Sequence, residues 1–407
     1  FTLAERARSR RLLDVLGSGS VSLPSLEAGE LLEQEARTRE ALARVRRQEA
    51  NDTAARSIAA SQHDQALSAL VQRYPRLARV FTVGAPALAE LQEVLPSETV
   101  VLSYYIARDT LFLFATGSSS QTAVVVPVTR TQLRTHVRDL VEGITALGAV
   151  DDTLTELSQL LIAPVAEVLR GAEHVVIVAD GALQQVPFAA LSLDGAALLE
   201  HFSLSYAPTL GLLFDLLSAR RATRPRSFAS FAASADLPYA RLEALAVGGS
   251  AARLGAQASE TALRSVSADA VDVATHAELD ADDPLGSALV LAATSADDGR
   301  LETREIFGLH APPALVALSA CQTAGQPLAT EAWVSLASAY LTAGTRTVVA
   351  SRQRVADLAT GVTMKRFFRR LATDSPANAL RRAMLETRSR FAHPAHWAGL
   401  ALIGDFR

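Results

Sequence analysis

The chain has 407 residues, of which 49% are apolar and 20% charged, and its formal net charge is −4 at pH 7. This length allows two or three compact domains, and the composition is that of a protein with a sizeable core. Nucleic-acid-binding domains normally carry a basic excess, so we expect no direct contact with nucleic acid. A single cysteine excludes an internal disulfide and favours a reducing compartment, the cytoplasm.

No apolar run approaches the ~20 residues of a membrane-spanning helix, and the first residues do not form a signal peptide. We therefore expect no membrane partner. The chain begins with Phe1 and not with Met, so we expect it to be part of a longer protein. Frequent Ala and Arg with little Lys is typical of a GC-rich bacterial genome, and we take the protein to be bacterial.

Residues 1–95 are predicted to be helical. Residues from Leu31 to Val45 recur at helical spacing, and a second helix is expected from about 54 to 74, ahead of Pro75. A charged helical hairpin of this kind usually packs on a neighbouring repeat, because it cannot bury its apolar face alone. We interpret 1–95 as a helical regulatory region at the end of a repeat array, although it has no clear period of about 34 residues.

The pattern changes at Pro96. Alternating and apolar runs predict strands over 100–106, 110–115 and 122–128. Two amphipathic helices are expected around 130–147 and 152–169.

From residue 172 onward, short apolar runs alternate with helical patterns. This alternation predicts an α/β fold with a mainly parallel sheet flanked by helices. Strands are expected over 174–179, 227–232, 270–275, 288–293, 314–319, 347–351 and 399–403. Helices are expected near 208–220, 237–248, 258–266, 331–343, 355–372 and 376–391. Ligands bind beyond the carboxyl ends of the strands in such sheets, so we look for chemistry there.

Two of these predicted strands end in reactive side chains. His276 follows the run 271–275, and Cys321 follows the run 315–320. Both side chains should therefore lie at the same edge of the sheet. A neutral thiol is a poor nucleophile, and a nearby imidazole can take its proton. The pair is a candidate for nucleophilic catalysis.

Several blocks of the sequence occur in the order that a known family has them. The segment from about 96 to 407 resembles a CHAT-type protease domain, which is related to caspases and separases and often follows tetratricopeptide repeats. The blocks are 178–183 with 186–191, 205–210, 274–276, 318–323, 343–351, and 393–397 with 403–405. The His-then-Cys order, 45 residues apart, also agrees with the ~50-residue spacing of caspases.

The resemblance implies a caspase-like fold with an inactive, pseudo-caspase-like half over 96–170 and an active protease half over 171–407. It implies that His276 and Cys321 cut a peptide bond through a thioester, with the backbone N–H groups of Ala277 and Cys321 binding the oxyanion. The family usually has Gly where this chain has Ala277, which still donates an N–H. No cofactor is implied.

The substrate-binding residues are expected to be Asp180, Ser319, Ser351, Arg352 and Gln353, and their charges conflict. Ser319 lies two positions before the nucleophile, where some relatives that cut after Arg or Lys have an acid. Asp180 could supply that charge from the loop after the neighbouring strand, or it could simply form a turn. Arg352 lies where caspases place an arginine that reads an acidic residue before the scissile bond (P1). We rank an uncharged P1 first, an acidic one second and a basic one third.

Two groups of possible metal ligands are interpreted as structural. His393 and His396 lack a Cys or a third ligand beside them. The acidic loop with Asp280, Asp282 and Asp283 lacks the Gly and the distal Glu of an EF-hand, so a solvated loop is expected, and a loose calcium site stays open.

The predicted function is a cysteine endopeptidase that cuts specific protein substrates under the control of an upstream regulatory or sensor domain or protein. A bacterial defence or signalling pathway, such as activation of a gasdermin-like effector, is the family-level expectation. The alternative is an inactive caspase-like scaffold, and a thiol-dependent transferase or other acyl hydrolase would share the chemistry. The intact pair His276 and Cys321 favours the protease, because a scaffold would be free to lose either residue.

Overall fold

The computed structural model describes residues 86–221, 223–280, 286–319, 321–322, 330–352 and 357–407, with a few isolated residues between 34 and 69. Most of the predicted region 1–95 lies outside this part of the chain, so the helical hairpin stays a prediction. The continuous description begins just before helix α5 (Leu88–Val94), which ends two residues before Pro96.

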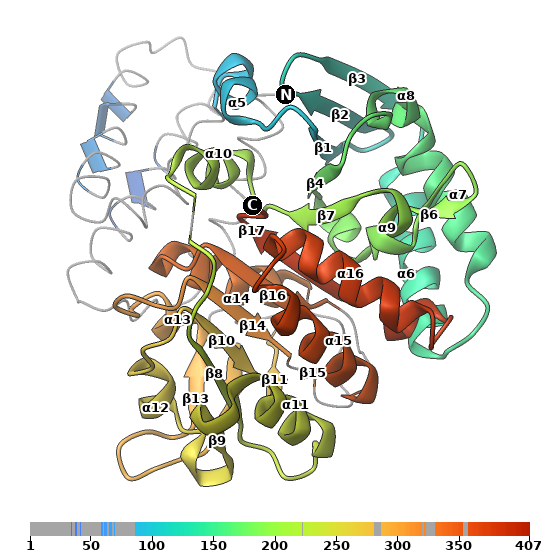
Figure 1. The fold of residues 1–407 in the computed structure, drawn as a ribbon. Helices are drawn as coiled ribbons and strands as arrows, with labels where there is room; N and C mark the ends of the chain where they lie inside the picture. Colours follow the sequence, from blue (N-terminus) through green and yellow to red (C-terminus); the bar gives the residue numbers. More distant parts are fainter. Residues whose placement is uncertain are drawn as a thin grey trace.

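The centre of the fold is an eleven-stranded sheet in the order β3-β2-β1-β4-β7-β17-β16-β14-β10-β8-β9 (Figure 1). Seven neighbouring pairs are parallel; the hairpin pairs β1-β2 and β2-β3 and the pair β16-β17 are antiparallel. The sheet is therefore mixed and mostly parallel, which confirms the predicted fold class. The strands are β1 (Thr99–Ile106), β2 (Leu111–Gly117), β3 (Gln121–Val126), β4 (His174–Val178), β7 (Ser203–Tyr206), β8 (Phe228–Ala232), β9 (Ala252–Leu254), β10 (Ala270–Val273), β14 (Leu315–Leu318), β16 (Thr347–Ser351) and β17 (Leu400–Gly404).

Helices cover both faces of this sheet, as strand β16 shows. Val349 belongs to the same buried cluster as Phe367 of α15, whereas Val348 and Ala350 belong to a second cluster with Tyr340 of α14. Successive side chains of a strand point to opposite faces, so α15 and α14 lie on opposite faces of the sheet. The helices are α6 (Arg130–Thr145), α7 (Asp151–Leu161), α8 (Ala166–Leu169), α9 (Leu198–His201), α10 (Leu210–Ser218), α11 (Pro238–Gly248), α12 (Glu260–Arg264), α13 (Thr303–Ile306), α14 (Thr330–Ala343), α15 (Asp357–Arg370) and α16 (Pro376–Arg388).

A second, four-stranded sheet lies beyond the carboxyl ends of β10 and β14. Its order is β13-β12-β11-β15, and it consists of β11 (His276–Glu278), β12 (Ala288–Val290), β13 (Arg300–Glu302) and β15 (Cys321–Gln322). Strand β11 begins three residues after β10 ends, and β15 begins three residues after β14 ends. The predicted strand 288–293 forms the short β12 of this sheet, so it is not part of the main one.

The main sheet runs without a break across the predicted boundary at residue 170. Strand β1, from the expected inactive half, pairs in parallel with β4, from the expected active half. Strand β4 in turn pairs with β7, a strand that the sequence reading did not predict. Strand β7 was missed because it has only four residues and two of them are serines, Ser203 and Ser205, which are buried and bonded to the ring of His174.

Candidate active site

The backbone brings the two predicted catalytic residues together. Strands β10 and β14 are parallel neighbours, so both chains leave the main sheet at the same edge and continue into β11 and β15. There, His276 is the register partner of Cys321 in a parallel pair. Paired strands lie about 4.8 Å apart, which is within the reach of an imidazole and a thiol on neighbouring residues.

The imidazole of His276 is held by a residue that the sequence reading missed, Asp236. His276 Nε2 lies 3.0 Å from a carboxylate oxygen of Asp236, in the loop between β8 and α11. The ring is about one-fifth exposed, whereas the side chain of Asp236 is 72% exposed. Hydrogen bonds from Ser234 and His276 lower the pKa of Asp236, so its carboxylate stays charged at neutral pH.

This contact leaves the other ring nitrogen available. A neutral imidazole that donates Nε2–H to Asp236 carries its lone pair on Nδ1. His276 Nδ1 is buried, and it has no hydrogen-bond partner among the residues that the structure describes. The arrangement therefore provides a base that is oriented on one side and free to take a proton on the other.

A sequence signal for Asp236 existed. It follows β8, the strand next to β10, by four residues, so it lies at the same carboxyl edge as His276. His276 and Cys321 were chosen because ligands bind beyond the carboxyl ends of the strands. The same rule would have chosen Asp236 as well.

The predicted oxyanion residue Ala277 occupies an extended strand. It pairs with Leu289 of β12 and with Gln322 of β15, and its side chain is fully buried. Among the described residues, the non-glycine residues with positive φ are Leu147, Asp194 and Ala311, so Ala277 adopts its backbone without strain. Ala in place of Gly therefore does not disturb this position.

Ser319 and Ser351 lie next to the edge of the main sheet at which His276 and Cys321 form their pair. Ser319 is buried just after β14, and its hydroxyl donates to the carboxylate of Asp272 over 3.2 Å. Ser351 is buried at the end of β16, the other neighbour of β14. Gln353 lies outside the described residues.

Asp180 does not lie where the sequence reading expected it. It follows β4, which is separated from β14 by β7, β17 and β16, so the loop is not next to the nucleophile strand. Its buried carboxylate accepts a hydrogen bond from the backbone N–H of Ile106 over 3.0 Å, which ties β1 to the loop after β4. The structure therefore places Asp180 in the packing of the other end of the sheet.

The side chain of Arg352 also lies away from the His276–Cys321 pair. Its guanidinium stacks over the ring of Tyr206 at 4.2 Å from the centroid. Tyr206 is the last residue of β7, and β17 lies between β7 and β16. Cys321 follows β14, which is the neighbour of β16 on its other side. Burial lowers the pKa of Arg352, and the contact with Tyr206 raises it again in part. The expectation that Arg352 reads the substrate is not supported by this position.

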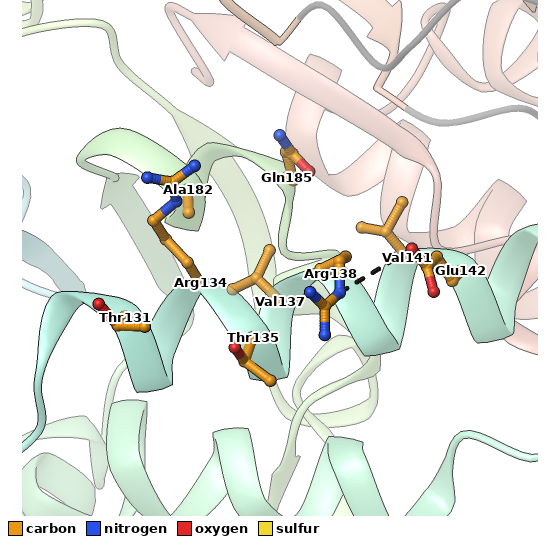
Figure 2. A pocket seen from close by; sticks show the side chains of 9 residues that line it. All are labelled: Thr131, Arg134, Thr135, Val137, Arg138, Val141, Glu142, Ala182 and Gln185. Carbon is orange, nitrogen blue, oxygen red and sulfur yellow. Dashed lines mark ion pairs between the residues drawn. The ribbon is translucent and has the colours of Figure 1, made fainter.

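A hollow of about 540 Å³ is lined by α6 and by the turn Gly181–Gln185 that follows Asp180 (Figure 2). Figure 2 shows that α6 supplies most of its lining, including Arg134 and Arg138, and that Ala182 and Gln185 come from the turn after β4. Three strands of the main sheet separate β4 from β14. The hollow is therefore separate from the His276–Cys321 pair.

Of the possible metal ligands, His393 and Asp280 have structural partners in the described residues. His393 donates from Nε2 to the carbonyl of Gly148 and accepts at Nδ1 from the N–H of Ala395, so both ring nitrogens are occupied. Asp280 binds Ser287 through its backbone, while Asp282 and Asp283 lie outside the described residues. Within the described part of the chain, no cluster of three or more His, Cys, Asp or Glu residues could hold a metal ion.

Comparison with known proteins identifies the class. The family model of the CHAT domain matches residues 151–405, more than half of the chain, so the protein belongs to the CHAT-domain family. Among curated proteins, none matches the chain.

Two solved structures of a separase–securin complex show the same fold. In the 2.6 Å structure of the Saccharomyces cerevisiae separase–securin complex, the similar chain is 11% identical, with a TM-score of 0.55 over 88% of this chain. A 3.0 Å structure of that complex gives a TM-score of 0.52 at 11% identity over the same share. This chain spans about a third, 34%, of that chain's length. The Arg-specific cysteine proteinase gingipain R is 10% identical with a TM-score of 0.40, over 68% of this chain and 74% of its own.

The family match and the two separase structures show that the chain has a caspase-like fold. In the described residues, no helix is both long enough and apolar enough to cross a membrane.

Proposed function

We propose that this protein is a cysteine endopeptidase in which Cys321 is the nucleophile, His276 the general base and Asp236 the residue that orients His276. The observation that carries the proposal is the register pair His276–Cys321, at the edge where the carboxyl ends of β10 and β14 meet. The imidazole held by Asp236, with a free buried nitrogen, supports it.

The proposed reaction has two stages. His276 Nδ1 takes the thiol proton, and the Cys321 thiolate attacks the peptide carbonyl. The backbone N–H groups of Ala277 and Cys321 hydrogen-bond the oxyanion, and the imidazolium gives its proton to the departing amine. A water molecule, activated by the same imidazole, then hydrolyses the thioester and restores the thiol.

Asp236 acts in this reaction through His276 and does not touch the substrate carbonyl. Its carboxylate keeps the Nε2–H tautomer and stabilises the imidazolium that forms when the thiol loses its proton. An inactive scaffold remains the second candidate, but nothing in a scaffold requires an acid–imidazole contact beside a cysteine.

The biological setting that we propose rests on the sequence resemblance. It is the cleavage of one or a few protein substrates in the cytoplasm of a bacterium, in defence or signalling, under the control of an upstream domain or protein. The similar separase chain was solved with a protein partner, securin, which fits regulation by a protein.

The test is cleavage of a proteome-derived peptide library by the full chain, with products identified by mass spectrometry. Cys321→Ala and His276→Ala should each abolish cleavage with the fold retained in circular dichroism. Residues that act as a unit lose function non-additively, so the double variant should be no worse than either single one. Cleavage by Cys321→Ala at the wild-type rate would contradict the proposal.

A further inference from the structure

Two buried acids meet between strand β10 and helix α11. Asp272 of β10 is fully buried, Glu243 of α11 is 3% exposed, and their carboxyl groups hydrogen-bond each other. A hydrogen bond between two carboxyl groups needs a proton, because an ionised carboxylate can only accept hydrogen bonds. The pair therefore holds at least one proton in the folded protein.

The surroundings of the acid pair favour this protonated form. Ser319 donates a hydrogen bond to Asp272 over 3.2 Å. A Cβ at Gly361 of α15 would lie 3.4 Å from Oε2 of Glu243, so the backbone of α15 packs against this acid. Removing a carboxylate from water is costly unless a positive group compensates its charge. Burial accordingly raises the pKa of Asp272 to about 7, and the hydrogen bonds of Glu243 and Ser319 lower it only in part.

The titratable and charged side chains of the neighbouring elements lie elsewhere, where the structure describes them. Strands β8 and β14, on either side of β10, contain no charged residue. The side chains that are exposed are those of Tyr239 and Arg241 of α11, Arg253 of β9, and Lys365 and Arg369 of α15. Arg366 and Arg370 of α15 pair with Glu386. A proton, and not a basic side chain of these elements, therefore compensates the charge of the acid pair.

The acid pair joins the same two chain segments that meet at His276. Asp272 lies four residues before His276, and Glu243 lies seven residues after Asp236, in the second turn of α11. The contact of Asp236 with His276 closes one end of these segments, and the acid pair closes the other. The position of α11 on β10 therefore determines whether Asp236 reaches the imidazole.

Helix α11 packs on the sheet through small and polar side chains. Its exposed residues include Tyr239, Leu242 and Leu245, whereas Ala240, Glu243 and Ala244 are buried. An Ala side chain buries little apolar surface, so polar contacts matter more for the position of this helix. Ser230 of β8 provides one such contact, since its hydroxyl donates to the carbonyl of Ala244 over 2.6 Å, and the acid pair provides another. Loss of the acid pair should therefore shift the helix and the residues that precede it.

We propose that Glu243 and Asp272 share one proton, and that this hydrogen bond holds α11 in the position in which Asp236 contacts His276. The two acids are then positioning residues of the proposed protease, and the inference rests on that proposed function. When the pH rises and the shared proton leaves, two buried carboxylates repel each other. Helix α11 then loses its contact with β10, and kcat falls because Asp236 no longer orients the imidazole.

The effect on stability has a defined sign. The pKa of Asp272 in the folded protein is raised above that of an unfolded Asp, which is about 3.9. The stability that the shared proton provides is therefore fully present below about pH 4 and is lost as the pH rises toward 7.

The first measurement is urea unfolding of the full chain from about pH 5 to about pH 7. In Glu243→Gln, the amide donates to an ionised Asp272, so the hydrogen bond no longer needs a proton. The folding equilibrium constant of wild type should therefore fall by about tenfold per pH unit relative to that of Glu243→Gln. Asp272→Asn, whose amide donates to Glu243, should show the same difference and carries the test if Glu243→Gln does not fold. Parallel pH profiles of wild type and both variants would overturn the shared proton.

The second measurement is kcat on one cleaved peptide at about pH 6 and about pH 8. Over this range wild type should lose about 3- to 10-fold more of its kcat than Glu243→Gln, at an unchanged KM. The difference should vanish when both proteins also carry Asp236→Asn, because the acids act through Asp236. Glu167→Gln, at an exposed glutamate of α8, is the matched control and should follow wild type in both measurements.

The two measurements separate the possible outcomes. A difference in stability without a difference in kcat would show that the acid pair is only structural, and a difference in kcat that persists beside Asp236→Asn would rule out the route through Asp236. Either result would overturn the inference and leave the protease intact. Cleavage that does not differ between wild type and Cys321→Ala would instead overturn the proposed function itself, and the urea profiles would then still test the shared proton.

Discussion

At the scale of single residues, the site depends on how one imidazole is held. Asp236 binds His276 Nε2, so it selects the tautomer whose Nδ1 can accept the thiol proton. We predict that Asp236→Asn lowers kcat roughly 10- to 100-fold with little change in KM, because the proton transfer is affected and substrate binding is not. Steady-state kinetics on one good substrate measure this split.

The conservative variant Asp236→Glu should recover part of kcat, since it restores a carboxylate near Nε2. The exposed Asp298, in the turn between β12 and β13, offers a control, and Asp298→Asn should behave as wild type. A rise in KM at unchanged kcat would mean that Asp236 binds the substrate and does not orient His276.

At the scale of elements, the pairing of β4 with β7 depends on a buried histidine. His174 Nδ1 and Nε2 each lie 2.8 Å from a hydroxyl, of Ser203 and Ser205 respectively, and its ring stacks on Phe406. Burial lowers the pKa of His174 to about 3, whereas an unfolded chain protonates it near 6.5. The contribution of the neutral His174 ring to the free energy of unfolding is thus fully present above pH 6.5. It is lost as the pH falls from 6.5 toward 3.

We therefore predict that His174 contributes a slope of about 1.4 kcal/mol per pH unit to the free energy of unfolding between pH 6 and 4. Urea unfolding of wild type and His174→Phe, which keeps the stacking ring, measures it as a difference in slope. His310→Gln, at an exposed histidine, is the control and should retain the wild-type slope. Parallel pH profiles of wild type and His174→Phe would contradict the prediction.

At the scale of the whole molecule, the last strand joins the two ends of the sheet. Strand β17 lies between β7 and β16, parallel to one and antiparallel to the other. Asp405 follows it and is almost fully buried between Arg346 and Arg407, and Arg407 also donates to the carbonyl oxygens of Leu216 and Leu217 at the end of α10. Burial alone would raise the pKa of Asp405, but the hydrogen bonds from Arg407 and Arg346 outweigh it and hold the pKa below its usual value.

We predict that Asp405→Ala lowers the free energy of unfolding by about 3–5 kcal/mol, since it leaves two partly buried guanidinium groups without their acid. Urea denaturation at pH 7 measures the loss. The exposed pair of Asp139 and Arg138 is the matched control, and Asp139→Ala should change stability by about 0.5 kcal/mol or less. A small effect of Asp405→Ala would mean that β17 is held by its backbone pairing alone.

Much of the architecture was predictable because the apolar runs of the sequence are also the buried strands of the sheet. Strands β1, β4, β14 and β16 are apolar runs that lie within two residues of their predicted ends. The short strands β9, β11, β13 and β15 were not predicted, because two or three residues carry no period. The placement of Asp180 failed for another reason: sequence order does not determine which strands are neighbours in a sheet whose order is not sequential. Arg352 does follow a neighbour of β14, but its side chain stacks on Tyr206, and a sequence does not show which way a side chain turns.

The sequence alone determined the fold class, the family resemblance and the choice of His276 and Cys321, because strand periodicity and the position of a residue after a strand are local properties. Only the tertiary structure decided what surrounds them. It placed Asp236 on His276, joined Ser319 to Asp272, and moved Asp180 and Arg352 away. The position of Asp236 after a strand is visible in the sequence, but its contact with His276 depends on the order of the strands in the sheet. Such long-range relations leave no mark in the spacing of residues along the chain.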